Sequence, residues 1–206
     1  MLPKKIILFD VDKTLIDTTN LFKEKIVAVI LKECNLTQIE YESLQDDYQA
    51  TLDKYTDFEP QGLLQFITKK NDVSHLYERA FGTKQFYLDS VFNDVLPVLN
   101  QVKSECRLGI FSEAVPSWQK FKLEMADLSR HFEPELLFIS RRKTEQSFLK
   151  ALPEAAYIID DNPQVITELQ AFNLVQPIWL NRVEDKTKLS VPTITNLYQL
   201  PTVLEE

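Results

Sequence analysis

The sequence is poor in the residues on which several common functional motifs depend. Its 206 residues include three glycines, Gly62, Gly82 and Gly109, and no two of them share a short segment. A Walker phosphate-binding loop and a dinucleotide-binding fingerprint each need several glycines in one turn. The sequence therefore excludes both motifs. The two histidines, His75 and His131, are too few for a histidine-rich metal site.

Cysteine and long apolar runs are also scarce. Cys34 and Cys106 are far apart in the sequence and imply no disulfide framework, so we expect both to be buried thiols. No apolar run approaches the roughly 18 residues that a membrane span needs. The apolar stretch near the N-terminus is too short for a signal peptide. These observations lead us to expect a soluble cytoplasmic protein with no membrane partner.

Acidic residues outnumber basic ones, and the formal net charge is −8. A protein that binds the phosphate backbone of nucleic acids needs a basic face, so this balance argues against a nucleic-acid partner. Hydrophobic residues make up 44% of the chain and charged residues 26%, which allows a buried core. The length suits one domain, or a core with one modest insert.

Short apolar runs alternate with helical patterns over most of the chain. The runs predict strands of a buried parallel sheet at 5–9, 107–111, 136–139, 157–159 and 175–180. Pro177 favours an edge position for the last strand. Helices are predicted at 94–104, 116–128, 144–152 and 163–172, with a short closing helix at 195–200. This alternation is typical of an α/β domain with a parallel sheet and flanking helices.

The segment 18–90 interrupts the alternation and has no strand pattern. Two stripes at helical spacing carry many of its apolar residues. They are Leu21, Phe22, Ile26, Val29 and Ile30, and then Leu44, Tyr48, Leu52 and Tyr55. We predict a helical insert of roughly 70 residues between the first and second strands. The core would then consist of 1–17 and 91–206.

Acidic residues follow two of the predicted strands. Asp10 and Asp12 come after the first strand, and Asp160 and Asp161 end the fourth. Ligands of open α/β sheets bind beyond the carboxyl ends of the strands, so we expect these groups to converge. Four clustered aspartates repel one another unless a cation lies among them, and oxygen ligands favour Mg²⁺. Two carboxylates on one loop also allow one to attack while the other transfers protons.

Four segments carry these groups and two further polar residues in a fixed order. They are Phe9-Asp10-Val11-Asp12-Lys13-Thr14-Leu15, Ile110-Phe111-Ser112, Lys143 before a predicted helix, and Ile158-Ile159-Asp160-Asp161. In this order they resemble the four motifs of the haloacid dehalogenase-like (HAD) hydrolase superfamily, over about 5–165. The resemblance implies a Rossmann-like catalytic core and a helical cap formed by the insert.

The resemblance also implies a role for each acidic residue. Asp10 would attack phosphorus and form an aspartyl-phosphate, and Asp12 would act as general acid and then general base. The Asp10 and Asp160 carboxylates and the Asp12 backbone carbonyl would hold Mg²⁺, with support from Asp161. This arrangement is chemically coherent, because phosphoryl transfer needs a positioned nucleophile and neutralised phosphoryl oxygens.

Two phosphate-binding residues and two departures from the family pattern complete this interpretation. Ser112 and Lys143 would bind the phosphoryl oxygens. Lys13 stands where many relatives have glycine, and it adds charge near the site. Thr144 follows Lys143 where proline is common. The other candidates for the phosphate-binding amine are Lys120, Lys122 and Lys150.

The resemblance favours a Mg²⁺-dependent phosphatase that acts on a small phosphorylated metabolite. Family members that act on carbon–halogen bonds lack an acid at the position of Asp12. A phosphotransferase and a catalytically silent binding protein of the same fold stay open, as do the substrate and the oligomeric state. A signalling receiver is disfavoured because its acidic pair comes early in the chain and its lysine last. Asp17 is predicted to cap the first cap helix, and Glu113 is expected near the site without an assigned role.

Overall fold

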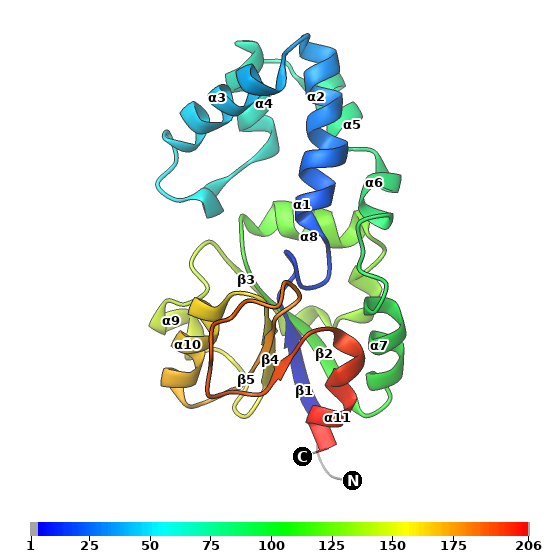
Figure 1. The fold of residues 1–206 in the computed structure, drawn as a ribbon, viewed down its shortest axis with the longest axis vertical. Helices are drawn as coiled ribbons and strands as arrows, with labels where there is room; N and C mark the ends of the chain where they lie inside the picture. The colour runs from blue at the N-terminus through cyan, green and yellow to red at the C-terminus, as the bar shows by residue number, and fades with distance from the viewer. Residues whose placement is uncertain (1–3, 206) are drawn as a thin grey trace.

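The computed structural model describes residues 4–205, except for the side chain of Tyr55. The outermost residues of the predicted core, 1–3 and 206, lie outside this description. One end of the molecule holds a sheet with helices around it, here called the sheet body, and the other end holds helices (Figure 1). Within residues 4–205, none of the helices combines the length and the apolar character that a membrane crossing requires.

A six-stranded sheet with the strand order β3-β2-β1-β4-β5-β6 forms the centre of the sheet body. The strands are β1 (Lys5–Phe9), β2 (Cys106–Glu113), β3 (Leu137–Ser140), β4 (Tyr157–Asp160), β5 (Gln176–Leu180) and β6 (Thr193–Ile194). All neighbouring strands pair in parallel. This arrangement confirms the predicted α/β class with a Rossmann-like parallel sheet and flanking helices.

The direction in which strands are added reverses beside β1. The chain runs outward from β1 to β2 and β3 and then places β4 on the other side of β1. Ligands of open α/β sheets bind outside the carboxyl ends of the strands at such a point. The carboxyl ends of β1 and β4 therefore mark the position where a functional site is expected.

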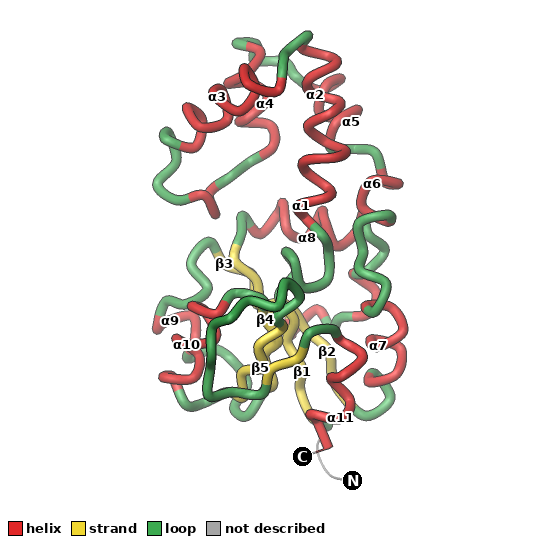
Figure 2. The backbone as a smooth tube through the Cα atoms, viewed as in Figure 1, coloured by secondary structure: helices red, strands yellow, loops and turns green. Residues whose placement is uncertain are grey.

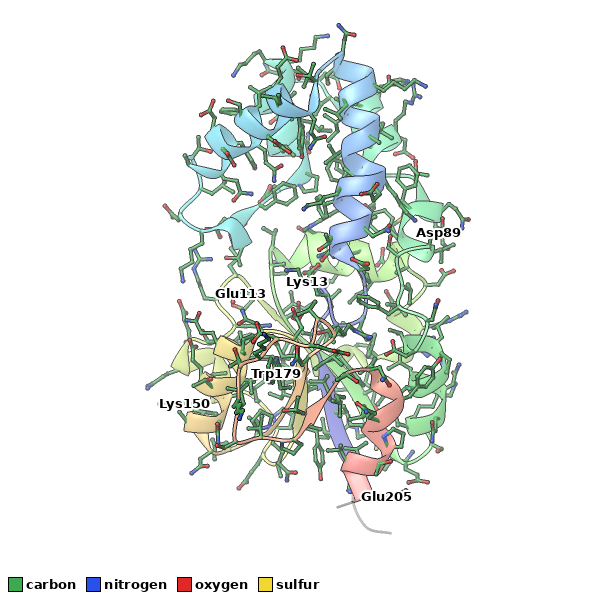
Figure 3. All side chains as sticks on the ribbon, in the orientation of Figure 1. Lys13, Asp89, Glu113, Lys150, Trp179 and Glu205 are labelled. Atoms are coloured by element: carbon green, nitrogen blue, oxygen red, sulfur yellow. The ribbon has the colours of Figure 1, made fainter. Side chains whose placement is uncertain are left out.

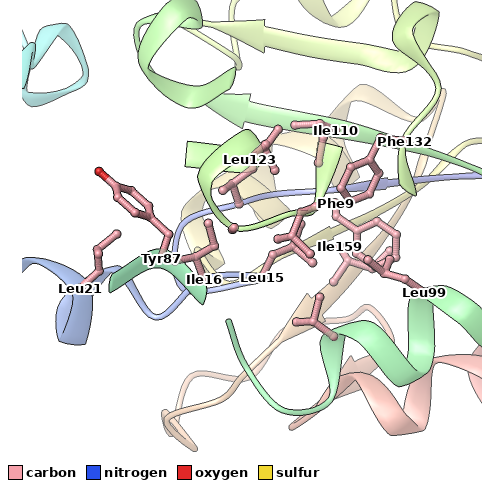
Figure 4. Packing of buried hydrophobic residues seen from close by; sticks show 14 of the residues in the cluster. Phe9, Leu15, Ile16, Leu21, Tyr87, Leu99, Ile110, Leu123, Phe132 and Ile159 are labelled. Atoms are coloured by element: carbon pink, nitrogen blue, oxygen red, sulfur yellow. The ribbon is translucent and has the colours of Figure 1, made fainter. Parts of the chain in front are cut away.

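Helices cover both faces of the sheet. Ile7 and Phe9 of β1 belong to an apolar cluster on one face, together with residues of α7 (Val95–Val102), α8 (Pro116–Met125) and α11 (Leu200–Glu205). Leu8 packs on the other face with residues of α9 (Gln146–Leu149) and α10 (Pro163–Phe172). Figure 4 shows Phe9 packed within the first cluster. This alternation explains why β1 is apolar at consecutive positions.

The helical insert, 18–90, follows β1, and strands are absent from its described residues (Figure 2). Its elements are α1 (Thr18–Asn20), a π-helical turn (Leu21–Ile26), α2 (Val27–Cys34), α3 (Gln38–Gln49), a 3₁₀ turn (Tyr55–Asp57), α4 (Pro60–Thr68), α5 (Ser74–Ala80) and α6 (Lys84–Leu88). The Asp17 side chain accepts a hydrogen bond from the Asn20 backbone nitrogen at 3.0 Å. Its predicted role as a helix cap is therefore confirmed.

Two antiparallel segments connect the insert to the sheet body. Ile16 and Val91 form a bridge, and the backbone nitrogen of Asp17 donates to the Ser90 carbonyl at 2.7 Å. These pairings lie at the predicted boundaries, 17/18 and 90/91. The division into a core of 1–17 and 91–206 and a cap domain of 18–90 stays a prediction.

The last part of the chain differs from the prediction. The segment 193–205 contains β6, a 3₁₀ turn (Leu197–Gln199) and α11, where the sequence predicts one helix at 195–200. The two-residue strand β6 forms through tertiary pairing, since the backbone nitrogen of Trp179 donates to the Pro192 carbonyl at 2.9 Å. The edge position predicted for β5 is therefore wrong. Among residues 4–205, β6 pairs with Trp179 and Leu180 of β5, so Pro177 needs no hydrogen bond on that side.

Two smaller expectations also need correction. The helix predicted at 144–152 is the single turn α9, Gln146–Leu149. Residues 143 and 144 stay outside this helix, and the side chain of Lys143 reaches into the sheet body. Both cysteines are free, as expected, but only Cys106 is buried, while Cys34 is partly exposed.

Three-residue 3₁₀ turns at Ser129–His131 and Pro134–Leu136 precede β3.

Candidate active site

The predicted site residues follow the carboxyl ends of the central strands. Asp10 comes directly after β1, and its backbone nitrogen donates to the Ile159 carbonyl at 2.9 Å. Ser112 lies near the end of β2, Lys143 follows β3, and Asp160 is the last residue of β4. All four side chains are buried. Figure 3 labels Glu113 and Lys13, which lie at the end of the sheet that faces the insert.

The Asp10 carboxylate is held by two side chains from other strands. The Ser112 hydroxyl donates to Asp10 Oδ1 at 2.8 Å, and Lys143 Nζ donates to the same oxygen at 3.0 Å. Lys143 Nζ also donates to Asp160 Oδ2 at 2.5 Å. Burial disfavours the Lys143 ammonium, but the carboxylates of Asp10 and Asp160 outweigh burial and raise its pKa. Lys143 is therefore a fixed positive charge beside the predicted nucleophile.

Three carboxylates form a cluster that could hold a metal ion. Oxygens of Asp10, Asp160 and Asp161 lie within 4.8 Å of one another. Burial and the neighbouring carboxylates raise the pKa of Asp10 to about 8, although Lys143 opposes this shift. Burial, followed by the charge of Asp160, raises the pKa of Asp161 to about 6. One ammonium does not balance three carboxylates, so the cluster fits a divalent cation with oxygen ligands such as Mg²⁺.

The Asp12 carboxylate lies outside this cluster. Its Oδ1 accepts a hydrogen bond from Lys122, and its Oδ2 accepts one from Gln119 Nε2 at 3.1 Å. Gln119 Nε2 also donates to the Ser112 hydroxyl oxygen at 2.8 Å. The metal-binding role predicted for Asp12 concerns its backbone carbonyl and stays a prediction. Its side chain is 34% exposed, which leaves it accessible for proton transfer.

Sequence reasoning missed Gln119 and did not assign Lys122 to Asp12. Neither residue belongs to a recognisable motif, and the sequence indicates Lys122 only as a candidate for binding phosphate. Their spacing, three residues apart on the helix after Ser112, is the one signal that could have indicated them. Lys120 and Lys150 are exposed. Among the four lysines considered, Lys143 is the one that contacts the Asp10 carboxylate, so the geometry favours it as the phosphate-binding amine.

The backbone at Lys13 explains why glycine is common at this position. Lys13 has a φ of 60°, in the left-handed region that glycine adopts at little cost. Its backbone nitrogen donates to the Ile16 carbonyl at 2.8 Å, which closes the turn after Asp12. The side chain is exposed, and its charge lowers the pKa of Asp161, although burial dominates there. Lys13 therefore adds positive charge beside the cluster, as expected.

A loop of the insert contacts the segment that carries Lys143. Asp57 accepts hydrogen bonds from both Arg141 and Arg142, and the Thr56 hydroxyl donates to the Arg141 carbonyl at 3.1 Å. Hydrogen bonds from Arg142 are the largest cause that lowers the pKa of Asp57, to about 2. This ionic contact joins the insert to the sheet body next to the site.

Glu113 lies near the site, as expected, and is partly buried. Burial raises its pKa, while Lys143, Lys54 and Arg142 act in the opposite direction. Lys54 belongs to the insert, so charged groups from both parts of the molecule meet beside Glu113. Its role stays unassigned.

These features define a class of α/β proteins with an acidic site at the switch point of a parallel sheet. The chain matches the family model for haloacid dehalogenase-like hydrolases over residues 7–166 and belongs to that family. It is therefore a HAD-like hydrolase. No curated protein matches the chain in sequence.

Solved structures of the same fold include several hydrolases. A HAD phosphatase from Thermococcus onnurineus is 20% identical, with a TM-score of 0.69 and 97% of each chain covered. YfnB from Bacillus subtilis, whose crystal structure contains magnesium, is 15% identical, with a TM-score of 0.66 and coverage of 98% of this chain and 99% of that one. The L-2-haloacid dehalogenase from Xanthobacter autotrophicus is 14% identical, with a TM-score of 0.61 and the same coverage. At these identities the likeness shows the fold.

Proposed function

We propose that the protein is a Mg²⁺-dependent hydrolase of small phosphate monoesters that works through an aspartyl-phosphate on Asp10. The observation that carries this proposal is the setting of Asp10. Its carboxylate is buried, is fixed by Ser112 and Lys143, and belongs to a cluster with Asp160 and Asp161. A carboxylate nucleophile needs such fixed donors to attack in a defined direction.

The residues of the site would act in two steps. In the first, an oxygen of Asp10 bonds to phosphorus, the ester bond from phosphorus to the leaving oxygen breaks, and Asp12 gives that oxygen a proton. In the second, water attacks phosphorus, Asp12 takes its proton, and the bond between phosphorus and Asp10 breaks to release inorganic phosphate. Ser112 and Lys143 would bind the phosphoryl oxygens throughout.

A metal ion would be held by Asp10, Asp160, Asp161 and the Asp12 backbone carbonyl. The all-oxygen donor set and the surplus negative charge of the cluster support Mg²⁺. When bound, it would neutralise charge on the phosphoryl group. The family resemblance and the magnesium-bound relative support the same ion.

Dehalogenation is the other hydrolase chemistry represented among the structural relatives. We favour phosphate esters because Asp12 is an acid that phosphoryl transfer uses and carbon–halogen cleavage does not need. The close contact of Asp12 with Lys122 supports a chemical role for this carboxylate. We also propose a small phosphorylated metabolite as substrate and a cytoplasmic location, since the net charge of −8 disfavours nucleic acid.

A phosphate-release assay on a panel of small phosphomonoesters tests the proposal. The wild-type protein should release phosphate with Mg²⁺ and lose this activity when a chelator is present. Asp10→Asn should lose it as well, whereas Asp47→Asn, on an exposed face of α3, should retain it. Hydrolysis that persists in Asp10→Asn would overturn the proposed nucleophile. Chloride release from a 2-chloro acid, with no phosphate release from any ester, would favour dehalogenation.

A further inference from the structure

Helix α8 holds both oxygens of the Asp12 carboxylate. Lys122 donates to Oδ1, and Gln119 donates to Oδ2 from one turn earlier on the same helix. Lys122 is only 3% exposed and Gln119 is fully buried. We propose that Lys122 and Gln119 are positioning residues that orient Asp12 for proton transfer to the leaving group. This inference rests on the proposed phosphatase function.

The burial of Lys122 supports a specific role. An ammonium that leaves water loses its hydration, and only a partner of opposite charge offsets this cost. Among the residues that the structure describes, Asp12 is the carboxylate with which Lys122 forms an ion pair. The Trp118 ring lies 5.7 Å from the ammonium and adds a cation–π contact. A lysine held in this way fixes the carboxylate that it contacts.

Gln119 connects Asp12 to the nucleophile. Its Nε2 donates to both Asp12 Oδ2 and the Ser112 hydroxyl oxygen, and the Ser112 hydroxyl donates to Asp10 at 2.8 Å. The side chains of Asp10 and Asp12 are therefore fixed relative to each other through two intermediate residues. Proton transfer requires the acid to lie within hydrogen-bond reach of the leaving oxygen when the nucleophile attacks, so this connection has a direct chemical use.

The face of α8 that carries Lys122 also packs against the insert through Trp118, four residues earlier. Trp118 makes aromatic contacts with Phe22, Phe58 and Phe81, at ring-centroid distances of 6.4, 6.5 and 5.7 Å. In Figure 1, α8 lies between the sheet and the insert helices. The packing of the insert on Trp118 thus fixes the helix that carries Gln119 and Lys122. Through α8, the position of the Asp12 side chain therefore depends on how the insert packs against the sheet body.

The chemistry of the leaving group gives a selective test. An alkyl phosphate needs its leaving oxygen protonated, whereas p-nitrophenyl phosphate releases a stable anion and needs little help. The value of kcat/KM reports the first chemical step, in which the leaving group departs. A general acid contributes about 10²–10⁴-fold to such a step. Loss of its positioning should therefore lower kcat/KM by about 10- to 100-fold for the alkyl ester and by less than about threefold for the aryl ester.

The experiment compares Lys122→Met with Lys120→Met, a control on the exposed face of the same helix. We expect the leaving-group-dependent loss in Lys122→Met, partial recovery in Lys122→Arg, and wild-type values in Lys120→Met. In an Asp12→Asn background, Lys122→Met should cause no further loss with the alkyl ester. Gln119→Met should show the same substrate dependence, and it serves as the test if Lys122→Met does not fold.

The possible failures can be distinguished. Equal losses on both esters in Lys122→Met, or an unchanged kcat with a KM raised equally for both, would overturn the positioning role. The second pattern would instead indicate direct phosphate binding by Lys122. If the wild-type protein hydrolyses neither ester, or if Asp10→Asn is as active as wild type, the proposed function itself fails.

Discussion

Replacement of Lys143 by methionine should destabilise the protein strongly. Lys143 is buried and donates to Asp10 at 3.0 Å and to Asp160 at 2.5 Å. Methionine has a similar length but no charge, so the substitution leaves two buried carboxylates without their shared partner. The loss therefore exceeds the value of one hydrogen bond, because it includes the cost of unpaired buried charge.

The magnitude follows from the burial of these groups. Removing one partner of a buried ion pair costs about 3–5 kcal/mol. For a protein of this length, about 1 kcal/mol corresponds to a change of about 2–4 °C in Tm, so a decrease of about 6–20 °C is expected. Protonation of Asp10 offsets part of this cost at neutral pH, because burial raises its pKa to about 8 even with Lys143 present. We therefore expect the decrease in Tm at neutral pH to lie near the lower end of this range.

The same reasoning gives the sign of the pH dependence. The folded Lys143→Met variant binds more protons than the unfolded chain between the ordinary carboxyl pKa of 3.8 and the raised pKa of Asp10. Its free energy of unfolding should therefore fall as the pH rises through this window. The wild-type protein shows the same trend up to its Asp10 pKa of about 8, and loss of the Lys143 charge raises this pKa further in the variant. The difference in Tm between the two proteins should therefore grow as the pH rises above about 8.

Thermal unfolding of the Lys143→Met and Lys150→Met variants without metal provides the assay. Lys150 is exposed, and its replacement should change stability by less than about 0.5 kcal/mol. At a pH above the raised pKa of Asp10, addition of Asp10→Asn to Lys143→Met should restore part of the lost stability, since it removes one unpaired charge. Equal Tm values for Lys143→Met and Lys150→Met at all pH values would refute the reasoning.

Three further predictions concern other parts of the structure. Mg²⁺ should raise the Tm of the wild-type protein, because at a concentration 100 times its Kd it adds about 2.7 kcal/mol to the free energy of unfolding. In a thermal titration with Mg²⁺, Asp161→Asn should show a smaller rise in Tm than the wild type. Gly109→Ala should lower the free energy of unfolding by about 1–3 kcal/mol in urea titrations, because its Cβ would lie 2.4 Å from the Leu136 carbonyl oxygen. Asp57→Asn should raise KM more than it lowers kcat in steady-state kinetics, because it removes the ionic contact between the insert and Arg142 beside the site; an unchanged KM would contradict a role for this contact in closing the site.

The strands that carry the site could be predicted because they are buried on both faces. β1 and β4 contain short apolar runs, and an aspartate directly follows β1 and ends β4. These runs can be recognised without knowledge of the neighbouring strands. The convergence of Asp10, Asp160 and Asp161 follows from strand order and a general rule about sheets. The predictions of these strands and of the acidic cluster therefore need only the local sequence and the order of the strands.

The missed features depend on tertiary contacts. β6 has two residues, too few for any periodic pattern, and it is defined by its pairing with Trp179 and Leu180 of β5. Gln119 and Lys122 are 107 and 110 residues away from Asp12 in the sequence. In the sequence of a helix, a buried lysine that contacts an aspartate cannot be told from a lysine on the surface. The predicted helix 144–152 is longer than α9, which spans Gln146–Leu149. Lys143 precedes this helix and contacts Asp10, and the local sequence pattern does not show that contact.

The central claim is that Asp10 accepts the phosphoryl group, and mass spectrometry of the acid-quenched protein tests it most directly. During turnover of a phosphomonoester with Mg²⁺, the peptide that contains Asp10 should gain the mass of one phosphoryl group, and this species should accumulate in Asp12→Asn if its breakdown needs the general base. Phosphate release by a wild-type protein that never carries a phosphoryl group on Asp10, or that carries it on another residue, would contradict the account.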